Sequence, residues 1–201
     1  MKSSSASMII ALSVTAVVVG GLLAGFYHLV YPMIEENRIA EERMAIFAVL
    51  QGAENYDVIE KEITGAKGKK EAVRIFKGMD KEGKTVGYAF IAEGPGFQGV
   101  IKMMVGLNIG PKKLSGMNVL EQVETPGLGN KITEERFTSQ FKNLSIEPKI
   151  EYIKNKKPEK PNEIQAITGA TISSKAVVNG VNNRMKLILD ILSPKMKIKE
   201  G

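Results

Sequence analysis

The sequence has no cysteine and a single histidine, His28, among its 201 residues. Without cysteine the chain has no disulfide, no thiol-ligated zinc, no iron–sulfur ligand and no cysteine nucleophile. The lone histidine lies ahead of the charged part of the chain, which excludes a histidine-rich metal site and a Ser-His-Asp triad there. Aromatic residues make up only 6% of the chain and do not alternate with basic ones, so nucleic-acid binding is not indicated.

Charge is almost missing from the first thirty residues, which carry only Lys2. All 22 acidic residues and 27 of the 28 basic residues follow them, a surplus of five positive charges (27 minus 22). The remaining length of about 170 residues is enough for one folded domain that buries a core without covalent staples. The sequence therefore divides into an apolar N-terminal segment and one charged domain.

The apolar segment runs from Met8 to Val30 behind a short tail, residues 1–7. As a helix, its 23 uncharged residues span roughly 34 Å, enough to cross a bilayer. A cleaved signal peptide has a shorter apolar region followed by a small-residue cleavage site, whereas Tyr31 and Pro32 follow here. We therefore expect a retained single-pass anchor. Charges flanking the segment are nearly balanced, and the short serine-rich tail favours a cytoplasmic N-terminus with the domain outside.

Beyond the membrane the patterns predict an α+β fold. Residues 31–52 read as a stalk helix, 53–194 as the folded domain and 195–201 as a C-terminal tail. Strands followed by helices favour an antiparallel sheet covered by helices. The strand-like runs of the predicted meander are Tyr56–Ile63, Ala72–Phe76, Thr85–Ala92, Gly99–Ile109 and Leu114–Gln122.

The second half of the domain is predicted to contain two helices. Glu134–Asn143 has a helical pattern with Thr133 as its cap, and Ser174–Leu192 has one broad apolar face. Lys149–Ile153 is predicted to be a further strand, and the basic segment Lys154–Pro161 a solvated loop.

A turn of small residues, Thr168-Gly169-Ala170-Thr171, leads into the last helix. The simpler interpretation is that Ser173 or Ser174 caps that helix and that Gly169 supplies a permissive turn conformation. The alternative is a phosphate site, because the first N–H groups of a helix are unpaired and its N-terminus is the positive end of the dipole. The nucleotide-binding patterns GxxxxGK[ST] and GxGxxG are both absent.

Two glycine-rich loops precede this turn. In Glu124–Gly129, a proline and two spaced glycines form a tight loop whose amides and Leu128 could meet a planar ligand, although an ordinary turn explains them as well. Gly94–Gly99 lies between two predicted strands, and a hairpin connection accounts for it equally well. Taken singly, these loops do not distinguish a binding site from a connection.

Taken together and in order, the segments GPGFQGVIKMMVGLN, VLEQVETPGLGNKI and ITGATISSKAV behind one membrane helix resemble a known family. They are similar to the FMN-binding subunits of Rnf and Nqr respiratory complexes, and the resemblance covers nearly the whole chain. The length is closer to the G subunit of Rnf-type ion-translocating electron-transport complexes than to the usually longer Nqr C subunit.

The resemblance implies that FMN is joined through its phosphate to Thr171 by a separate flavin transferase. Thr168, Gly169, Ala170 and Ser173 match the rest of that attachment motif. The family's loop against the flavin is matched by Glu124, Thr125, Gly127, Leu128 and Gly129. Many members carry Asp six residues before the attachment threonine, where this chain has Gln165.

The implied function is that of an electron-carrying subunit with covalent FMN in a membrane complex that couples ferredoxin and NAD chemistry to Na⁺ or H⁺ translocation. The subunit has no catalytic residue of its own and no metal on this interpretation; its partners are the other membrane subunits, and its domain lies on the outer side of the cell membrane. Two alternatives stay open: the C subunit of sodium-pumping NADH:quinone oxidoreductase, and a membrane-tethered scaffold or binding domain without flavin.

Overall fold

The computed structural model describes residues 2–64, 70–110 and 112–196, and it divides into two compact units, residues 1–41 and 42–201. Helix α1 (Lys2–Val49) contains Pro32 and is long and apolar enough to cross a membrane. The apolar side chains of its first unit are exposed, as expected for a surface that faces lipid or other helices. One continuous helix thus includes residues that the sequence divides among tail, anchor and stalk, and it ends three residues before position 52.

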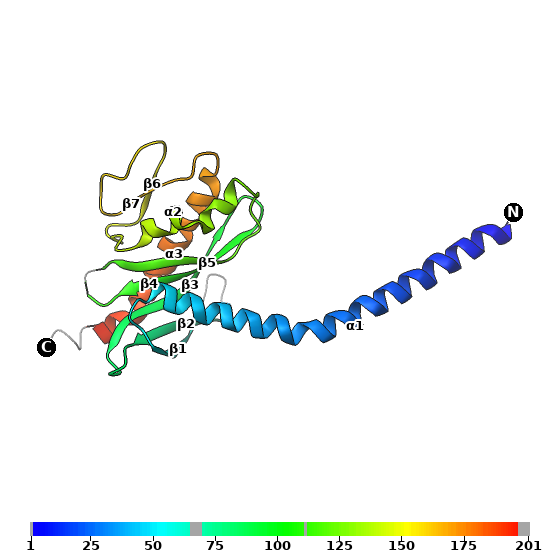
Figure 1. Ribbon diagram of the computed structural model, residues 1–201, viewed down its shortest axis with the longest axis horizontal. Coiled ribbons are helices and arrows are strands. Elements are labelled where there is room, and N and C mark those ends of the chain that lie inside the picture. Colours follow the sequence, from blue (N-terminus) through cyan, green and yellow to red (C-terminus); the bar gives the residue numbers. More distant parts are fainter. Residues whose placement is uncertain (1, 65–69, 111, 197–201) are drawn as a thin grey trace. The chain divides into compact units, whose positions relative to one another are not determined.

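Five strands in the second unit form one antiparallel meander in the order β1-β2-β3-β4-β5 (Figure 1). Their bounds are Asn55–Thr64, Lys70–Met79, Thr85–Pro95, Val100–Asn108 and Leu114–Glu121. Each neighbouring pair is antiparallel, with register shifts in the β2–β3 and β4–β5 pairs. The predicted antiparallel sheet and α+β fold are confirmed.

The two faces of the sheet bury different clusters, because side chains alternate along each strand. Ile75 and Phe90 face a large core that also contains the apolar stripe of the last helix, α3 (Thr171–Met196). Phe76, Ala89 and Met104 face the opposite way and pack with the last turns of α1, from Ala45 to Val49, and with Leu50 directly after it. The sheet is therefore covered on both faces by helix.

Helix α3 lies unusually close to β3, and glycines permit this approach. A Cβ on Gly180 would lie 2.6 Å from the carbonyl oxygen of Glu93, and a Cβ on Gly94 would overlap the backbone of Ala176. The contact fixes the first turns of α3 beside the end of β3. The helix begins at Thr171, three residues before the predicted start, so the small-residue turn leads directly into it.

The predicted helix Glu134–Asn143 is wrong in its detail. Residues 134–143 contain only the short helix α2 (Glu135–Thr138) and the 3-10 turn η2 (Ser139–Phe141), and the 3-10 helix η1 (Gly129–Thr133) precedes them. Thr133 does not cap it, because its hydroxyl donates to the Asn130 carbonyl. Phe137 and Phe141 are both buried with ring centroids 5.5 Å apart, and tertiary packing of these rings overrides the weak helical preference of the short segment.

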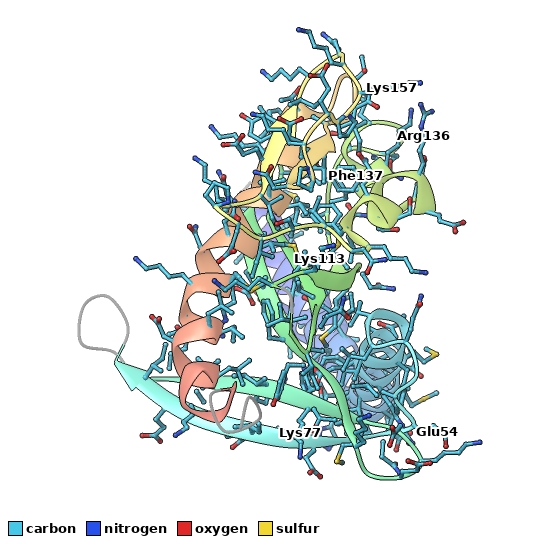
Figure 2. The ribbon with its side chains drawn as sticks, turned by 90° about the vertical axis from the view of Figure 1, so that its left-hand side faces the viewer. Glu54, Lys77, Lys113, Arg136, Phe137 and Lys157 are labelled. Atoms are coloured by element: carbon cyan, nitrogen blue, oxygen red, sulfur yellow. The ribbon has the colours of Figure 1, made fainter. Side chains whose placement is uncertain are left out.

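A second, two-stranded sheet adds to the predicted architecture. Strands β6 (Glu151–Ile153) and β7 (Glu163–Gln165) pair in parallel, and the basic segment Lys154–Pro161 forms the exposed connection between them. Arg136, Phe137 and Lys157 lie at one end of the domain, whereas Glu54 and Lys77 lie at the other (Figure 2). Of the predicted C-terminal tail, residues 195 and 196 belong to α3, and residues 197–201 lie outside the described part.

Candidate functional site

Three loops that are far apart in sequence meet where α3 begins. They are the β3–β4 connection, the loop after β5 and the turn before α3, and together they enclose a cleft of about 390 Å³. We call it the Thr171 cleft; its lining residues are Phe97, Glu124, Thr125, Leu128, Gly129, Gly169, Ala170, Thr171, Ile172 and Ser173. Its volume lies within the range of small-molecule sites.

The carboxylate of Glu124 joins these three loops from the inside. It is only 5% exposed, and its Oε1 accepts hydrogen bonds from the backbone N–H groups of Phe97 at 2.8 Å and Gln98 at 2.9 Å. Its Oε2 accepts a hydrogen bond from the hydroxyl of Ser173 in the first turn of α3. Neighbouring Thr125 accepts a further bond from the Gln98 side chain at 2.8 Å. Glu124 thus supports the wall of the cleft through hydrogen bonds to two other loops.

Small residues around Glu124 leave no spare volume. A Cβ on Gly129 would lie 2.7 Å from Oε2 of Glu124 and 2.8 Å from the Ser173 hydroxyl. A Cβ on Gly96 would lie 2.5 Å from Oε1 of the same carboxylate. Gly96 and Gly129, which belong to different sequence motifs, therefore both allow close packing around the buried carboxylate of Glu124. Neither motif indicates this role by itself.

The pKa of Glu124 is lowered below its usual value. Burial acts to raise it, but hydrogen bonds from the Ser173 hydroxyl and from the amides of Gln98, Phe97 and Gly99 have the larger combined effect. Because the folded pKa lies below the unfolded value of about 4.3, the carboxylate stabilises the fold above that pH. This contribution is lost as the pH falls through the folded pKa.

The stability difference between wild type and Glu124→Gln should therefore shrink on acidification from neutral pH to about pH 3. Denaturant unfolding of the full chain in detergent, followed by circular dichroism at both pH values, measures that difference. Glu163, whose pKa is also lowered, is present in both proteins, so its contribution cancels. A difference that stays constant over this range would show that the charge of Glu124 does not support the loops.

The serines of the turn do not cap α3 as the simpler interpretation expects. The hydroxyl of Ser173 is bound to Glu124, while that of Ser174 accepts from the Ile167 N–H at 3.0 Å and donates to the Ala170 carbonyl at 3.0 Å. Within the residues that the structure describes, the N–H groups of Thr171, Ile172 and Ser173 have no hydrogen-bond partner. Gly169 precedes them with φ at +84°, a conformation that side chains rarely adopt. The turn thus presents three unpaired donors at the positive end of a 26-residue helix.

The structure brings most of the predicted site residues together. Eight line the Thr171 cleft: Glu124, Thr125, Leu128, Gly129, Gly169, Ala170, Thr171 and Ser173. Gly127 is absent from the lining and supplies a turn with φ at +76°. Thr168 lines a different cleft. Phe97 and Ile172, which sequence analysis did not select, contribute exposed apolar walls, 67% and 54% accessible.

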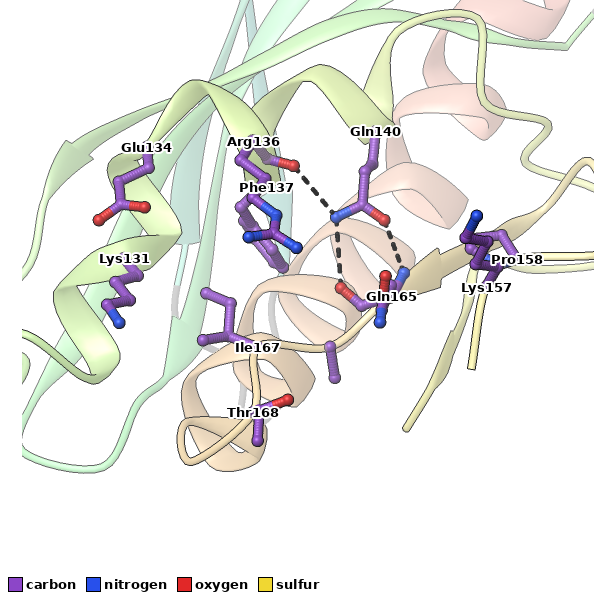
Figure 3. Close-up of a pocket in the computed structure, with 11 residues that line it drawn as sticks. Lys131, Glu134, Arg136, Phe137, Gln140, Lys157, Pro158, Gln165, Ile167 and Thr168 are labelled. Carbon is purple, nitrogen blue, oxygen red and sulfur yellow. Dashed lines mark hydrogen bonds between the residues drawn. The ribbon is translucent and has the colours of Figure 1, made fainter. Parts of the chain in front are cut away.

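The second cleft lies beyond Thr168 and has a volume of about 600 Å³. We call it the Arg136 cleft; it is lined by Lys131, Glu134, Arg136, Phe137, Gln140, Lys157, Pro158, Gln165, Ala166, Ile167 and Thr168 (Figure 3). The Gln140 side chain holds β7 by accepting from the Gln165 N–H at 2.7 Å and donating to the Gln165 carbonyl at 3.3 Å. Gln165 is thereby fixed through its backbone, and its own side-chain amide is not used in these bonds.

Comparison with known proteins gives a consistent result. Residues 96–186 match a family model described as FMN-binding domain. The chain is 28% identical over 177 residues to the G subunit of the proton-translocating ferredoxin:NAD(+) oxidoreductase complex of Clostridium ljungdahlii, covering 88% of each chain. It is 28% identical over 184 residues to the G subunit of an ion-translocating oxidoreductase complex of Methanosarcina acetivorans, covering 90% of this chain and 93% of the relative.

A third relative is the G subunit of the Na(+)-translocating ferredoxin:NAD(+) oxidoreductase complex of Acetobacterium woodii, with 32% identity over 158 residues and 74% of each chain covered. Among solved structures, NqrC of Shewanella oneidensis is similar with a TM-score of 0.54 and 23% identity, covering 67% of this chain and 66% of that one. The C subunit of the Na(+)-translocating NADH-quinone reductase of Parabacteroides distasonis has a TM-score of 0.52 and 20% identity, covering 65% and 73%. These two likenesses show a shared fold.

Proposed function

The chain belongs to the family of G subunits of ion-translocating oxidoreductase complexes, and from that premise we propose that it carries electrons through FMN bound covalently to Thr171. The observation that carries this proposal is the position of the Thr171 hydroxyl. It lines a cleft of suitable volume at the N-terminus of α3, next to three unpaired amides of the described helix. A phosphoester formed at this hydroxyl would place an anionic phosphate where the helix favours negative charge.

The residues of the Thr171 cleft fit the parts of FMN. The amides of Thr171, Ile172 and Ser173 are donors for phosphate oxygens, and Gly169 allows close approach of the backbone. Phe97, Leu128 and Ile172 offer exposed apolar surface to a flat aromatic ring system, and Thr125 is a polar residue of the same lining. Within the described residues no cluster of His, Asp and Glu could hold a metal ion.

When bound, FMN supplies the redox chemistry, because a flavin reversibly accepts and releases electrons. The protein's part is to hold and shield it. Thr171 serves as a tether that prevents loss of the cofactor, and Glu124 keeps the Phe97 loop and the first turn of α3 in place around it. No side chain of the cleft needs to transfer a proton to a substrate, so the isolated chain is expected to turn over nothing.

The same proposal includes how FMN is attached and where the protein lies in the cell. We propose that a separate flavin transferase forms the phosphoester, as the family resemblance implies. The protein works together with other membrane subunits, and α1 anchors it as a single-pass helix in the cell membrane. We further propose that the folded domain lies on the outer side of this membrane.

The alternative of an Nqr-type C subunit has support from the shared fold only, whereas identity over most of the chain favours the G subunits. The other alternative, a scaffold without flavin, is separated by one experiment. We expect the full chain, made in cells that contain the transferase, to give a fluorescent band under ultraviolet light after denaturing electrophoresis. A dark band from such cells would favour the scaffold.

A further inference from the structure

The Arg136 cleft contains positive charges that the redox function does not use. Lys131 belongs to η1, Arg136 to α2 and Lys157 to the β6–β7 connection, and all three are exposed. None forms an ion pair with any residue that the structure describes, whereas nearby Lys160 pairs with Glu163 at 3.3 Å. With Glu134 as the only acid in the described lining, the net charge of the cleft is +2 (three cations minus one anion).

The three cations surround the cleft instead of converging on one point. Figure 3 shows Lys131 on the left, Arg136 in the centre and Lys157 on the right, with Ile167 and Thr168 below Arg136. A single small anion is best held by buried donors that point to one position. Cations spread over an exposed rim fit several carboxylates spaced along a polypeptide.

Part of the lining of the cleft is apolar. It consists of the exposed Pro158, the half-buried Ile167 and the buried Phe137. The side-chain amide of Gln165 can both donate and accept, and its backbone is held by Gln140. Carboxylates at the rim and an apolar side chain in the middle are therefore the chemistry that this surface would recognise.

The cleft is also next to the proposed flavin. Ile167 and Thr168 line the Arg136 cleft, and the following residues Gly169 to Thr171 line the Thr171 cleft, so one turn of chain is the wall between the two. A polypeptide bound in the Arg136 cleft would contact residues that lie only a few positions before the attachment threonine. Such a place suits a protein that gives electrons to the flavin or takes them from it.

We propose that the Arg136 cleft is the docking site for an acidic, partly apolar segment of another subunit of the same complex. The inference rests on the proposed function, because that function implies the partner subunits. Docking in the Arg136 cleft itself does not require the flavin. Charge complementarity should make the contact weaken with rising ionic strength, because exposed pairs are screened.

Photocrosslinking in intact membranes tests the proposal. The full chain, expressed with the other subunits, carries benzoyl-phenylalanine in place of Pro158, and in a second preparation in place of Lys186, which lies on α3 outside the cleft. We expect a product from position 158 that contains a peptide of another subunit rich in Asp and Glu, and no such product from position 186. Cross-linking to lipid alone, to no polypeptide, or to a peptide without acidic residues would overturn the proposal.

Charge variants make the test specific. Reversal of all three cations (Lys131→Glu, Arg136→Glu, Lys157→Glu) should lower the yield from position 158 about tenfold, because attraction becomes repulsion. The matched control reverses three exposed lysines outside the cleft, Lys84, Lys142 and Lys186, with the same change in net charge, and should alter the yield less than about twofold. Equal losses in both would contradict the inference.

Two further variants separate this proposal from the flavin and from misfolding. Gln165→Asp adds one negative charge at a side chain that makes no hydrogen bond in the described structure, and it should lower the yield about threefold. If the triple variant does not accumulate, the result with Gln165→Asp tests the proposal instead, and an unchanged cross-linking yield would overturn it.

Thr171→Ala should be dark in the gel yet cross-link normally from position 158. Loss of its cross-linked product would contradict docking by the cleft itself. A dark wild type that still cross-links would refute the flavin proposal alone.

Discussion

Replacing Thr171 with alanine should reduce the in-gel flavin fluorescence of the chain to background. The substitution removes the hydroxyl of the first residue of α3, which lines the Thr171 cleft. Without that oxygen no phosphoester can form, so the loss should be complete and the fold intact, because Thr171 makes no side-chain hydrogen bond in the described structure. Electrophoresis of equal protein amounts under ultraviolet light, followed by staining, measures the effect.

Thr168→Ala is the matched control, since it removes a hydroxyl three residues away that faces the other cleft. Its band should stay fluorescent. Thr171→Ser keeps an attacking oxygen and should retain part of the flavin. Fluorescence in the Thr171→Ala band would move the attachment to another residue, and a dark Thr168→Ala band would show that the loss follows from the motif as a whole.

The second large effect is expected at Glu124. Its replacement by alanine should destabilise the folded domain by about 3 kcal/mol, because two backbone N–H groups and the Ser173 hydroxyl lose their buried acceptor. For a chain of this size that corresponds to a fall of roughly 10 °C in Tm. Glu124→Gln should cost about 1 kcal/mol, since an amide keeps the shape and can still accept from both N–H groups. Thermal unfolding of the full chain in detergent gives both values.

Glu121→Ala is the control for this prediction. It removes a carboxylate three residues away that is 60% exposed and pairs with Lys102 at 3.0 Å. Exposed pairs of this kind contribute about 1 kcal/mol at most. If Glu121→Ala and Glu124→Ala lowered Tm equally, the buried hydrogen bonds of Glu124 would not be holding the three loops together.

The regular elements could be predicted because their patterns are local. Side chains in β2 to β4 alternate between the two faces of the sheet, which is the period of a strand. The apolar stripe of α3 repeats with the period of a helix. The 129–141 segment could not, because its two phenylalanine rings bend a short and weakly helical stretch into three pieces against the core. The two rings are buried against strands that are distant in sequence, so the local pattern of residues 129–141 does not indicate this structure.

The candidate site also has residues that the sequence could predict and residues that it could not. Thr171 and its neighbours could be selected because a small-residue turn at a helix N-terminus has a recognisable chemistry and a family likeness. From the sequence, Phe97 could not be distinguished from an ordinary hairpin residue, because its loop is held at the cleft by hydrogen bonds to Glu124 and Thr125, which lie about 27 residues further along the chain. Nor could the sequence show that Thr168 and Thr171 face different clefts, because that depends on how β7 turns into α3.

The mass of the tryptic peptide that ends at Lys175 tests the central claim most directly. The full chain is purified from cells that contain the flavin transferase and digested, and the peptide is sequenced by tandem mass spectrometry. A phosphoester at Thr171 predicts a mass increase equal to FMN less one water, located on that residue. Unmodified peptide from such cells, with modified peptide undetectable, would contradict the account.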